Sequence, residues 1–284
     1  MTKDSIVEEK NETLLLRTAI RAALEAGAGI MEVERDGDFN TSFKSDDSPL
    51  TQADRVSHDI ITSMLLLTGI PILSEEGKGT SYMERSQWSR LWIVDPLDGT
   101  KEFLKRNGEY TVNIALIENN RPVFGVIFTP ATGALYFGGP EFGGWKIEDA
   151  YNTLAPDHDF DSMLTIATRM TSSADRFNRP VIVGSRSHMN EETNAFIDSI
   201  RTKHGDVDFV SKGSSLKICL VAEGLADIYP RMAPTMEWDI AAGDAISAAV
   251  GCLLIEHATG NPLQYNKENL VNPNFVLYGN GYRP

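Results

Sequence analysis

The sequence predicts a mixed α/β protein built from two closely packed lobes. In the first half, apolar residues recur at helical spacing over 13–34 and runs of strand type then follow one another, which indicates α+β structure with an antiparallel sheet. From about residue 162, short strand runs alternate with helical segments, a pattern typical of α/β structure. We therefore expect an N-terminal lobe at 1–158 and a C-terminal lobe at 159–284 within one compact unit.

The elements of the first half can be placed in order. Helical periodicity predicts a long amphipathic helix at Thr13–Glu34. A second helix is expected from Thr51, a candidate cap, to Leu67. The turn-rich stretch 36–54 between them predicts a loop or an exposed hairpin. Strands are expected at 70–77, 90–96, 110–130 and 133–139, and the third of these is two strands joined by a tight turn at 118–122.

The second half begins after a turn-rich boundary at 152–161. Helices are expected at Asn190–His204, Ser214–Glu223 and Trp238–Val250. Between and around them, strands are expected at 179–187, 208–213, 225–231, 251–258 and 274–280.

Charge and composition exclude some classes of protein. The net charge is −14, from 40 acidic and 26 basic residues, so a general nucleic-acid binder is not expected, although a small basic pocket for one phosphorylated ligand remains compatible. Cys219 and Cys252 lie in apolar segments, as reduced core thiols of a cytosolic protein do. No signal peptide is apparent and no apolar run approaches the ~20 residues of a membrane span. We expect a cytoplasmic protein.

Two carboxylates stand around a proline in the stretch "LWIVDPLDGTKEF". The apolar run before them predicts a buried strand, after which Asp95 and Asp98 follow three residues apart across a turn at Pro96. Converging carboxylates repel each other unless a proton or a cation neutralises them. Gly99 permits close backbone approach, and a helix beginning near Thr100 would offer free N–H groups to a phosphate. The alternative is a capped turn whose carboxylates are solvated.

Other acidic residues stand at comparable places in the predicted elements. Glu75 and Glu76 end a predicted strand, whereas Asp54 and Asp239 lie in first turns of predicted helices. Each alone is ordinary, because acidic residues complement the helix dipole. Together they are oxygen donors without an accompanying histidine or cysteine pattern, and such a set favours Mg²⁺ over Zn²⁺.

The segments "SEE", "WIVDPLDGT" and "WDIAAGDA", in this order, resemble the inositol monophosphatase superfamily of Mg²⁺-dependent, lithium-sensitive phosphatases. The resemblance covers residues from about 44 to 244. It implies a layered αβαβα sandwich of the inositol monophosphatase and fructose-1,6-bisphosphatase type.

Further segments narrow the resemblance to one group of this superfamily. "FKSDDSPLTQAD" and "GSSLKICLVAEGLADIYPR" are similar to the CysQ-type 3'(2'),5'-bisphosphate nucleotidases, and "KEF" at 101–103 departs from the Thr-Asn-Phe usual in inositol monophosphatases. This implies hydrolysis of adenosine 3',5'-bisphosphate (PAP) to AMP and phosphate, in sulfur assimilation and nucleotide recycling. Two alternatives stay open: an inositol 1-phosphate or broad sugar phosphatase, and a non-catalytic sensor of nucleotides or metal ions.

The resemblance also implies roles for individual residues. Two or three Mg²⁺ ions would be held by Glu75, Asp95, Asp98, Asp239 and the carbonyl of Leu97. Mn²⁺ is expected to substitute for Mg²⁺, and Li⁺ is expected to inhibit the enzyme. Asp54 and Thr100 would orient and deprotonate the attacking water. The substrate would be bound by Gly99, Thr100, His188, Ser214, Lys217, Arg231 and Asp239.

Spacing bears on some of these roles. Ser214 and Lys217, three residues apart, are expected on one helix face, where a hydroxyl and an ammonium could hold a second phosphate. Arg231 adds a planar fork suited to phosphate. Asp244, five residues after Asp239, is not expected to be a ligand. The roles of Asp46, Asp47 and Glu76 stay open.

The protein is expected to be a monomer or homodimer, with at most weak peripheral association with the cytoplasmic face of a membrane.

Overall fold

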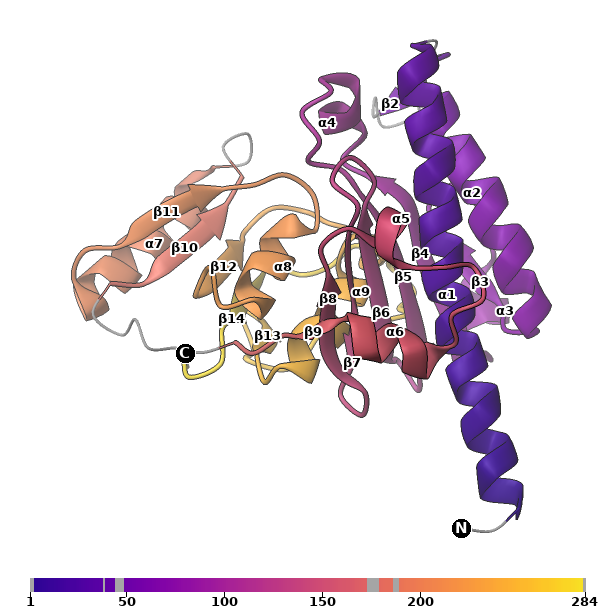
Figure 1. The fold of residues 1–284 in the computed structure, drawn as a ribbon. Coiled ribbons are helices and arrows are strands. Elements are labelled where there is room, and N and C mark those ends of the chain that lie inside the picture. The colour runs from indigo at the N-terminus through magenta and orange to yellow at the C-terminus, as the bar shows by residue number, and fades with distance from the viewer. Residues whose placement is uncertain (1–2, 38, 44–48, 173–178, 186–188, 283–284) are drawn as a thin grey trace.

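The computed structural model describes residues 3–282 apart from 38, 44–48, 173–178 and 186–188. Its elements form five layers: helices, a seven-stranded sheet, helices, a five-stranded sheet and a last helix (Figure 1). Three clusters of buried apolar side chains fill the spaces between the layers. The predicted αβαβα sandwich is confirmed.

The first layer is made by α1 (Lys3–Asp36) and α2 (Gln52–Leu65), which continues into the 3₁₀ turn η1 (Leu66–Thr68). Both helices pack on one face of the large sheet. α1 begins ten residues before the predicted helix, because 3–12 is rich in Glu and Lys, which favour helix without an apolar stripe. The short strands β1 (Ser42–Phe43) and β2 (Pro49–Leu50) pair antiparallel, as the hairpin alternative predicted.

The seven-stranded sheet has the order β3-β4-β5-β6-β7-β8-β9. Only β3 is parallel to its neighbour, so the predicted antiparallel sheet is confirmed. β8 was not predicted, because the glycines of "FGGWKI" hide the strand pattern, and β9 was not predicted, because two residues are too few to show one. The strands are β3 (Ile72–Ser74), β4 (Arg90–Asp98), β5 (Thr111–Glu118), β6 (Arg121–Thr129), β7 (Ala134–Gly139), β8 (Gly143–Ile147) and β9 (Thr168–Arg169).

Short helices connect these strands or lie against them. Three of them, α3, α5 and α6, were not predicted, since each has seven residues or fewer and shows too little periodicity. They are α3 (Tyr82–Arg85), α4 (Thr100–Leu104), α5 (Ala150–Thr153) and α6 (Phe160–Ile166). α4 begins at Thr100, where a helix start was expected beside the phosphate-binding turn.

The five-stranded sheet has the order β11-β10-β12-β14-β13. α8 and α9 lie between the two sheets, and α7 covers the outer face of the small sheet (Figure 1). The strands are β10 (Val181–Gly184), β11 (Asp208–Ser211), β12 (Ile228–Arg231), β13 (Leu253–Glu256) and β14 (Phe275–Tyr278), and the helices are α7 (Glu191–His204), α8 (Leu216–Ala222) and α9 (Glu237–Ala249). The division into lobes at 158/159 stays a prediction.

Two smaller predictions concern the cysteines and membrane spans. Cys219 and Cys252 are buried in the core and neither forms a disulfide with a described residue, as predicted for core thiols. Within the described parts of the chain, every helix is too short or too polar to cross a bilayer.

Candidate active site

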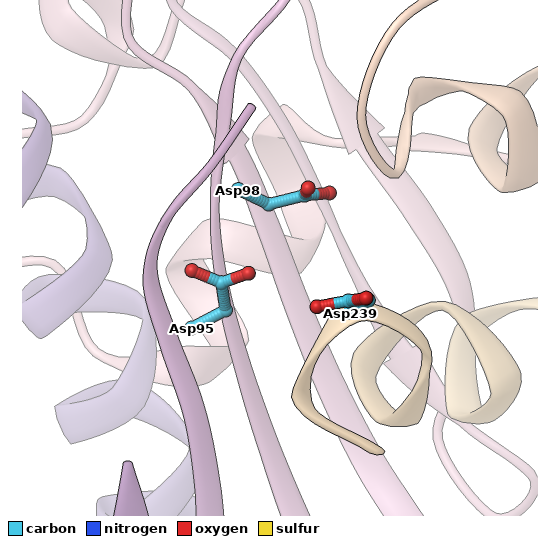
Figure 2. A group of neighbouring side chains, drawn as sticks. All are labelled: Asp95, Asp98 and Asp239. Atoms are coloured by element: carbon cyan, nitrogen blue, oxygen red, sulfur yellow. The ribbon is translucent and has the colours of Figure 1, made fainter. Parts of the chain in front are cut away.

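Three carboxyl groups converge between the large sheet and α9. Asp95 and Asp98 come from β4, and Asp239 comes from the first turn of α9 (Figure 2). One oxygen from each lies within 4.8 Å of the others. Asp95 is buried, whereas Asp98 and Asp239 are partly exposed, so the cluster opens towards solvent on one side.

A β-bulge explains why Asp95 and Asp98 face the same side. Side chains three residues apart on a regular strand point to opposite faces. Here Asp95 pairs with Asn113 and Asp98 pairs with Thr111, so four residues of β4 lie opposite three residues of β5. The extra residue at Pro96–Leu97 restores the shared face. β4 therefore continues through both carboxylates to Asp98, two residues beyond the predicted strand at 90–96.

Burial and like charge make this cluster unfavourable for three free anions. Burial, followed by the charges of Glu75, Asp98 and Asp239, raises the pKa of Asp95 well above its usual range. Burial and the charge of Asp98 raise the pKa of Asp239 to about 8, although the Met236 N–H donates to it. Glu75 lies outside the group of three, but its carboxyl hydrogen-bonds to that of Asp95. Protons or a hard cation must neutralise such a set of oxygen donors.

These shifts predict how stability depends on pH. When folding raises the pKa of a carboxyl group, the group stabilises the folded protein at pH values below its unfolded-state pKa of about 3.9. This stability is lost as the pH rises through the folded-state pKa, which is about 8 for Asp239. The metal-free protein should therefore melt at least ~3 °C lower at pH 8.5 than at pH 6. Saturating Mg²⁺ should remove most of this difference, because the ions replace the protons. Scanning calorimetry with and without chelator checks this, and an identical pH dependence in both conditions would contradict it.

Asp54 and Thr100 are hydrogen-bonded to each other, while their predicted role in water activation stays a prediction. The Thr100 hydroxyl donates to Asp54 Oδ1 at 3.2 Å and lies 3.4 Å from the Leu97 carbonyl oxygen. Asp54 Oδ2 accepts from the backbone N–H and the hydroxyl of Thr51, at 2.7 and 2.6 Å. These bonds belong to the capping box at the start of α2. The Ser57 hydroxyl donates to the Pro96 carbonyl at 2.6 Å and so fixes α2 to the bulge.

The loop before α8 contacts Asp98 directly. The hydroxyls of Ser214 and Ser215 donate to Asp98 Oδ2 at 2.6 and 2.8 Å. The prediction that Ser214 lies on the helix with Lys217 is wrong, because Ser214 has left-handed backbone (φ 50°) and α8 begins at Leu216. Lys217 is buried and donates to the Ser214 carbonyl at 2.5 Å, with its Nζ 5.6 Å above the ring of Tyr229. Burial lowers the pKa of Lys217 to about 8.

A cavity of about 230 Å³ joins the acidic cluster to basic side chains. Asp98 and Asp239 line it together with Lys217 and Arg231. Arg231 Nη2 donates to the Pro234 carbonyl at 3.2 Å, while its buried Nε has no partner among the described residues. Gly99, with φ 92°, also lines the cavity, and a Cβ there would lie 3.2 Å from the Glu109 carbonyl oxygen. A larger residue would therefore be strained at Gly99.

Some predicted residues cannot be placed at the cluster. His188, Asp46 and Asp47 lie outside the described residues, so their roles stay predictions. Glu76 is half-buried in the turn after β3, which leaves its role open. Asp244 accepts a hydrogen bond from the Tyr265 hydroxyl at 2.8 Å and is not in the converging group. That it is no ligand stays a prediction.

Sequence reasoning missed several polar residues around Asp98. Ser215 was not singled out, although its hydroxyl contacts both Asp98 and the Asp239 carbonyl. Thr111 and Asn113, fully buried on β5, were read only as parts of a strand. Their signal was the alternation of polar and apolar residues in "EYTVNI", within a strand that is otherwise apolar. Buried polar residues in a central strand need partners and therefore indicate a site or an interface.

Known proteins resemble this chain over nearly its whole length. The 3'(2'),5'-bisphosphate nucleotidase CysQ of Salmonella typhimurium is 40% identical over 266 residues, which cover 92% of this chain and 98% of the relative. The crystal structure of CysQ from Bacteroides thetaiotaomicron, titled a bacterial member of the inositol monophosphatase family, is 47% identical with a TM-score of 0.85, covering 94% of this chain and 97% of that one.

More distant structures share the fold alone. The extragenic suppressor protein suhB of Bartonella henselae is 23% identical, with a TM-score of 0.70 and coverage of 94% of both chains. The sequence profile described as "Inositol monophosphatase family" matches residues 11–281. The predicted family is confirmed: the chain belongs to the inositol monophosphatase family.

Proposed function

We propose that this protein is a Mg²⁺-dependent 3'(2'),5'-bisphosphate nucleotidase that hydrolyses the 3'-phosphate of PAP to give AMP and phosphate. The observation that supports this function is a cavity lined by both carboxylate and basic side chains. Asp98 and Asp239 belong to the converging acids, while Lys217 and Arg231 line the same cavity. A substrate with two phosphates could place one at each set of groups. The names of the CysQ relatives agree with this reaction.

The residues present suit the metal ions that the reaction would need. Glu75, Asp95, Asp98, Asp239 and the Leu97 carbonyl would hold two or three Mg²⁺ ions, and the buried, mutually repelling carboxyls favour such neutralisation. When bound, the ions would supply charge stabilisation for the phosphoryl group and lower the pKa of the attacking water. Mn²⁺ should replace Mg²⁺, and Li⁺ should inhibit.

Asp54 and Thr100 would handle the proton of the attacking water. Because Thr100 donates its own proton towards Asp54 Oδ1, a lone pair of its Oγ1 is free to accept a hydrogen bond from a water. As the water attacks phosphorus, its proton would pass to Thr100 Oγ1 and the threonine proton to Asp54. Thr51, which donates two hydrogen bonds to Oδ2, would keep the carboxylate oriented. The N–H groups of Gly99 and Thr100 would hold the scissile phosphate.

The second phosphate would bind at Lys217 and Arg231. Two carbonyl oxygens, of Ser214 and Lys212, account for two donors of the Lys217 ammonium, and its third N–H would serve the ligand. Arg231 would add a second cation. His188 is proposed to lie near the nucleotide, and Ser214 to assist from its place between Asp98 and Lys217.

A comparison of substrates tests the proposed function. Phosphate release from PAP should exceed release from inositol 1-phosphate at equal concentration, should require Mg²⁺ and should fall in Li⁺. Faster release from inositol 1-phosphate would support the broad phosphatase instead. PAP binding without hydrolysis in saturating Mg²⁺ would support a sensor. We further propose that the enzyme recycles nucleotides during sulfur assimilation. It would act in the cytoplasm as a monomer or homodimer.

Replacing Lys217 by methionine should raise the KM for PAP at least ~10-fold, because a charge-assisted hydrogen bond to phosphate is lost. Methionine has an unbranched apolar side chain of similar length, so the fold should survive. In the unaltered protein the ammonium loses its proton as pH rises through about 8, so the KM for PAP should rise above that pH. The KM of Lys217→Met should lack this rise. Steady-state kinetics from pH 6.5 to 9.5 checks both statements, and matching KM profiles would contradict the role of Lys217.

A further inference from the structure

A row of polar side chains on the large sheet faces the loop before α8. Thr111 and Asn113 are two residues apart on β5 and therefore share a face, and Glu109 precedes them at the same spacing. Thr111 and Asn113 are 0% and 1% exposed. The Thr111 hydroxyl also lies 3.0 Å from Asn113 Oδ1, which links the two side chains.

Each of the three residues contacts a successive part of the loop at 212–215. Glu109 accepts from the Lys212 ammonium at 3.0 Å and from the Gly213 N–H at 2.8 Å. Thr111 Oγ1 lies 2.5 Å from Ser214 Oγ, and Asn113 Nδ2 donates to Ser215 Oγ at 2.8 Å. We call Glu109, Thr111 and Asn113, with these contacts, the polar seam. A Cβ at Gly213 would lie 3.1 Å from that of Glu109, so the seam also requires a residue without a side chain there.

The far side of the same loop reaches the metal-binding acids. The two serine hydroxyls that the seam holds are the ones that donate to Asp98 Oδ2. Ser215 Oγ also lies 2.9 Å from the Asp239 carbonyl oxygen. A hydroxyl can rotate about its Cβ–Oγ bond, so Ser214 and Ser215 can fix Asp98 only if something fixes them. Thr111 and Asn113 are buried, and each makes one further hydrogen bond to one of the two serine hydroxyls, which limits its rotation.

We propose that the polar seam positions Asp98 for divalent-cation binding. Thr111 and Asn113 are positioning residues that act through Ser214 and Ser215, and Glu109 anchors the loop at its outer end. Without the seam, Asp98 would have to be ordered when the ion binds, and that cost would appear as weaker binding. This inference rests on the proposed function in one respect, since it takes Asp98 to be a metal ligand.

Mn²⁺ binding, measured by calorimetry without substrate, tests the proposal. Thr111→Val keeps the shape of the side chain but removes the hydroxyl, and it should weaken Mn²⁺ binding about tenfold. Thr111→Ser restores the hydroxyl and should restore the affinity to within about twofold. Thr129→Val is the matched control, because Thr129 is 2% exposed on the neighbouring strand and its Oγ1 has no partner among the described residues. That variant should bind Mn²⁺ as the unaltered protein does.

Each outcome bears on the proposal. Unchanged Mn²⁺ affinity in Thr111→Val, or equal weakening in Thr129→Val, would overturn it. Should Thr111→Val fail to fold, Glu109→Ala on the partly exposed end of the seam should still weaken Mn²⁺ binding about threefold, and an unchanged affinity there would also overturn the proposal. The nucleotidase assay is separate: a protein that binds Mn²⁺ through the seam but leaves PAP intact would contradict only the proposed function.

Discussion

Replacing Asp95 by asparagine is expected to reduce the turnover of PAP at least ~10²-fold while the protein stays folded. Asp95 is the most buried of the three converging carboxyls, and its oxygens reach towards both Glu75 and the pair formed by Asp98 and Asp239. Asparagine has nearly the same shape but no charge, so it would bind a divalent cation poorly. The loss should therefore appear in kcat and persist when Mg²⁺ is raised.

Asp95→Asn should also change the thermal stability of the protein. Burial and like charge disfavour the charged form of Asp95 in the metal-free protein. The neutral amide removes this repulsion, so metal-free Asp95→Asn should melt no lower than the unaltered protein at pH 8. It should, however, lose most of the increase in melting temperature that Mg²⁺ produces. Asp157→Asn, at an exposed position, is the control. Turnover within tenfold of normal, with a normal response to Mg²⁺, would contradict the assignment.

Asp54→Asn should reduce turnover by ~10² to 10⁴-fold with little change in metal affinity. The amide oxygen can still accept from Thr100 or from Thr51, so the start of α2 should remain capped. The amide cannot take up the proton that Thr100 would pass on, and this separates proton transfer from metal binding. Rapid-mixing measurement of phosphate release, with Mn²⁺ titration alongside, makes the distinction.

A matched variant controls for the charge change on the same helix. Asp59 is exposed on α2, so Asp59→Asn should leave turnover unchanged. If Asp54→Asn lost metal affinity as well as turnover, Asp54 would be a ligand or a structural support of the cluster. If it kept full turnover, the proton-transfer role would be wrong.

The acidic residues of the site could be singled out from the sequence because several of them lie near strand ends or in the first turns of helices. Asp239 lies in the first turn of α9 and Asp54 in the first turn of α2, as the helix patterns indicated. Such patterns depend on short-range periodicity, which the sequence carries directly. Asp95 and Asp98 drew attention through their spacing around Pro96. The bulge that places them on one face depends on the register with β5, which no local pattern reveals.

The surroundings of Asp98 were predicted less well, for a related reason. The segment 214–223 reads as one amphipathic helix, but Ser214 adopts left-handed backbone and Ser215 directs its hydroxyl to Asp98. These conformations depend on contacts with Thr111 and Asn113, about 100 residues earlier in the chain. Tertiary hydrogen bonds therefore override local helix propensity at this point. The glycines of β8 hid that strand for a different reason, since they carry no side chains to alternate.

We propose that residues far apart in the sequence form one site for divalent cations. Anomalous diffraction from crystals soaked in Mn²⁺ tests this most directly. Manganese peaks are expected in contact with Asp95, Asp98 and Asp239, with Glu75 and the Leu97 carbonyl completing the ligand set. A map without manganese at these carboxylates, from crystals soaked at millimolar concentration and neutral pH, would contradict it.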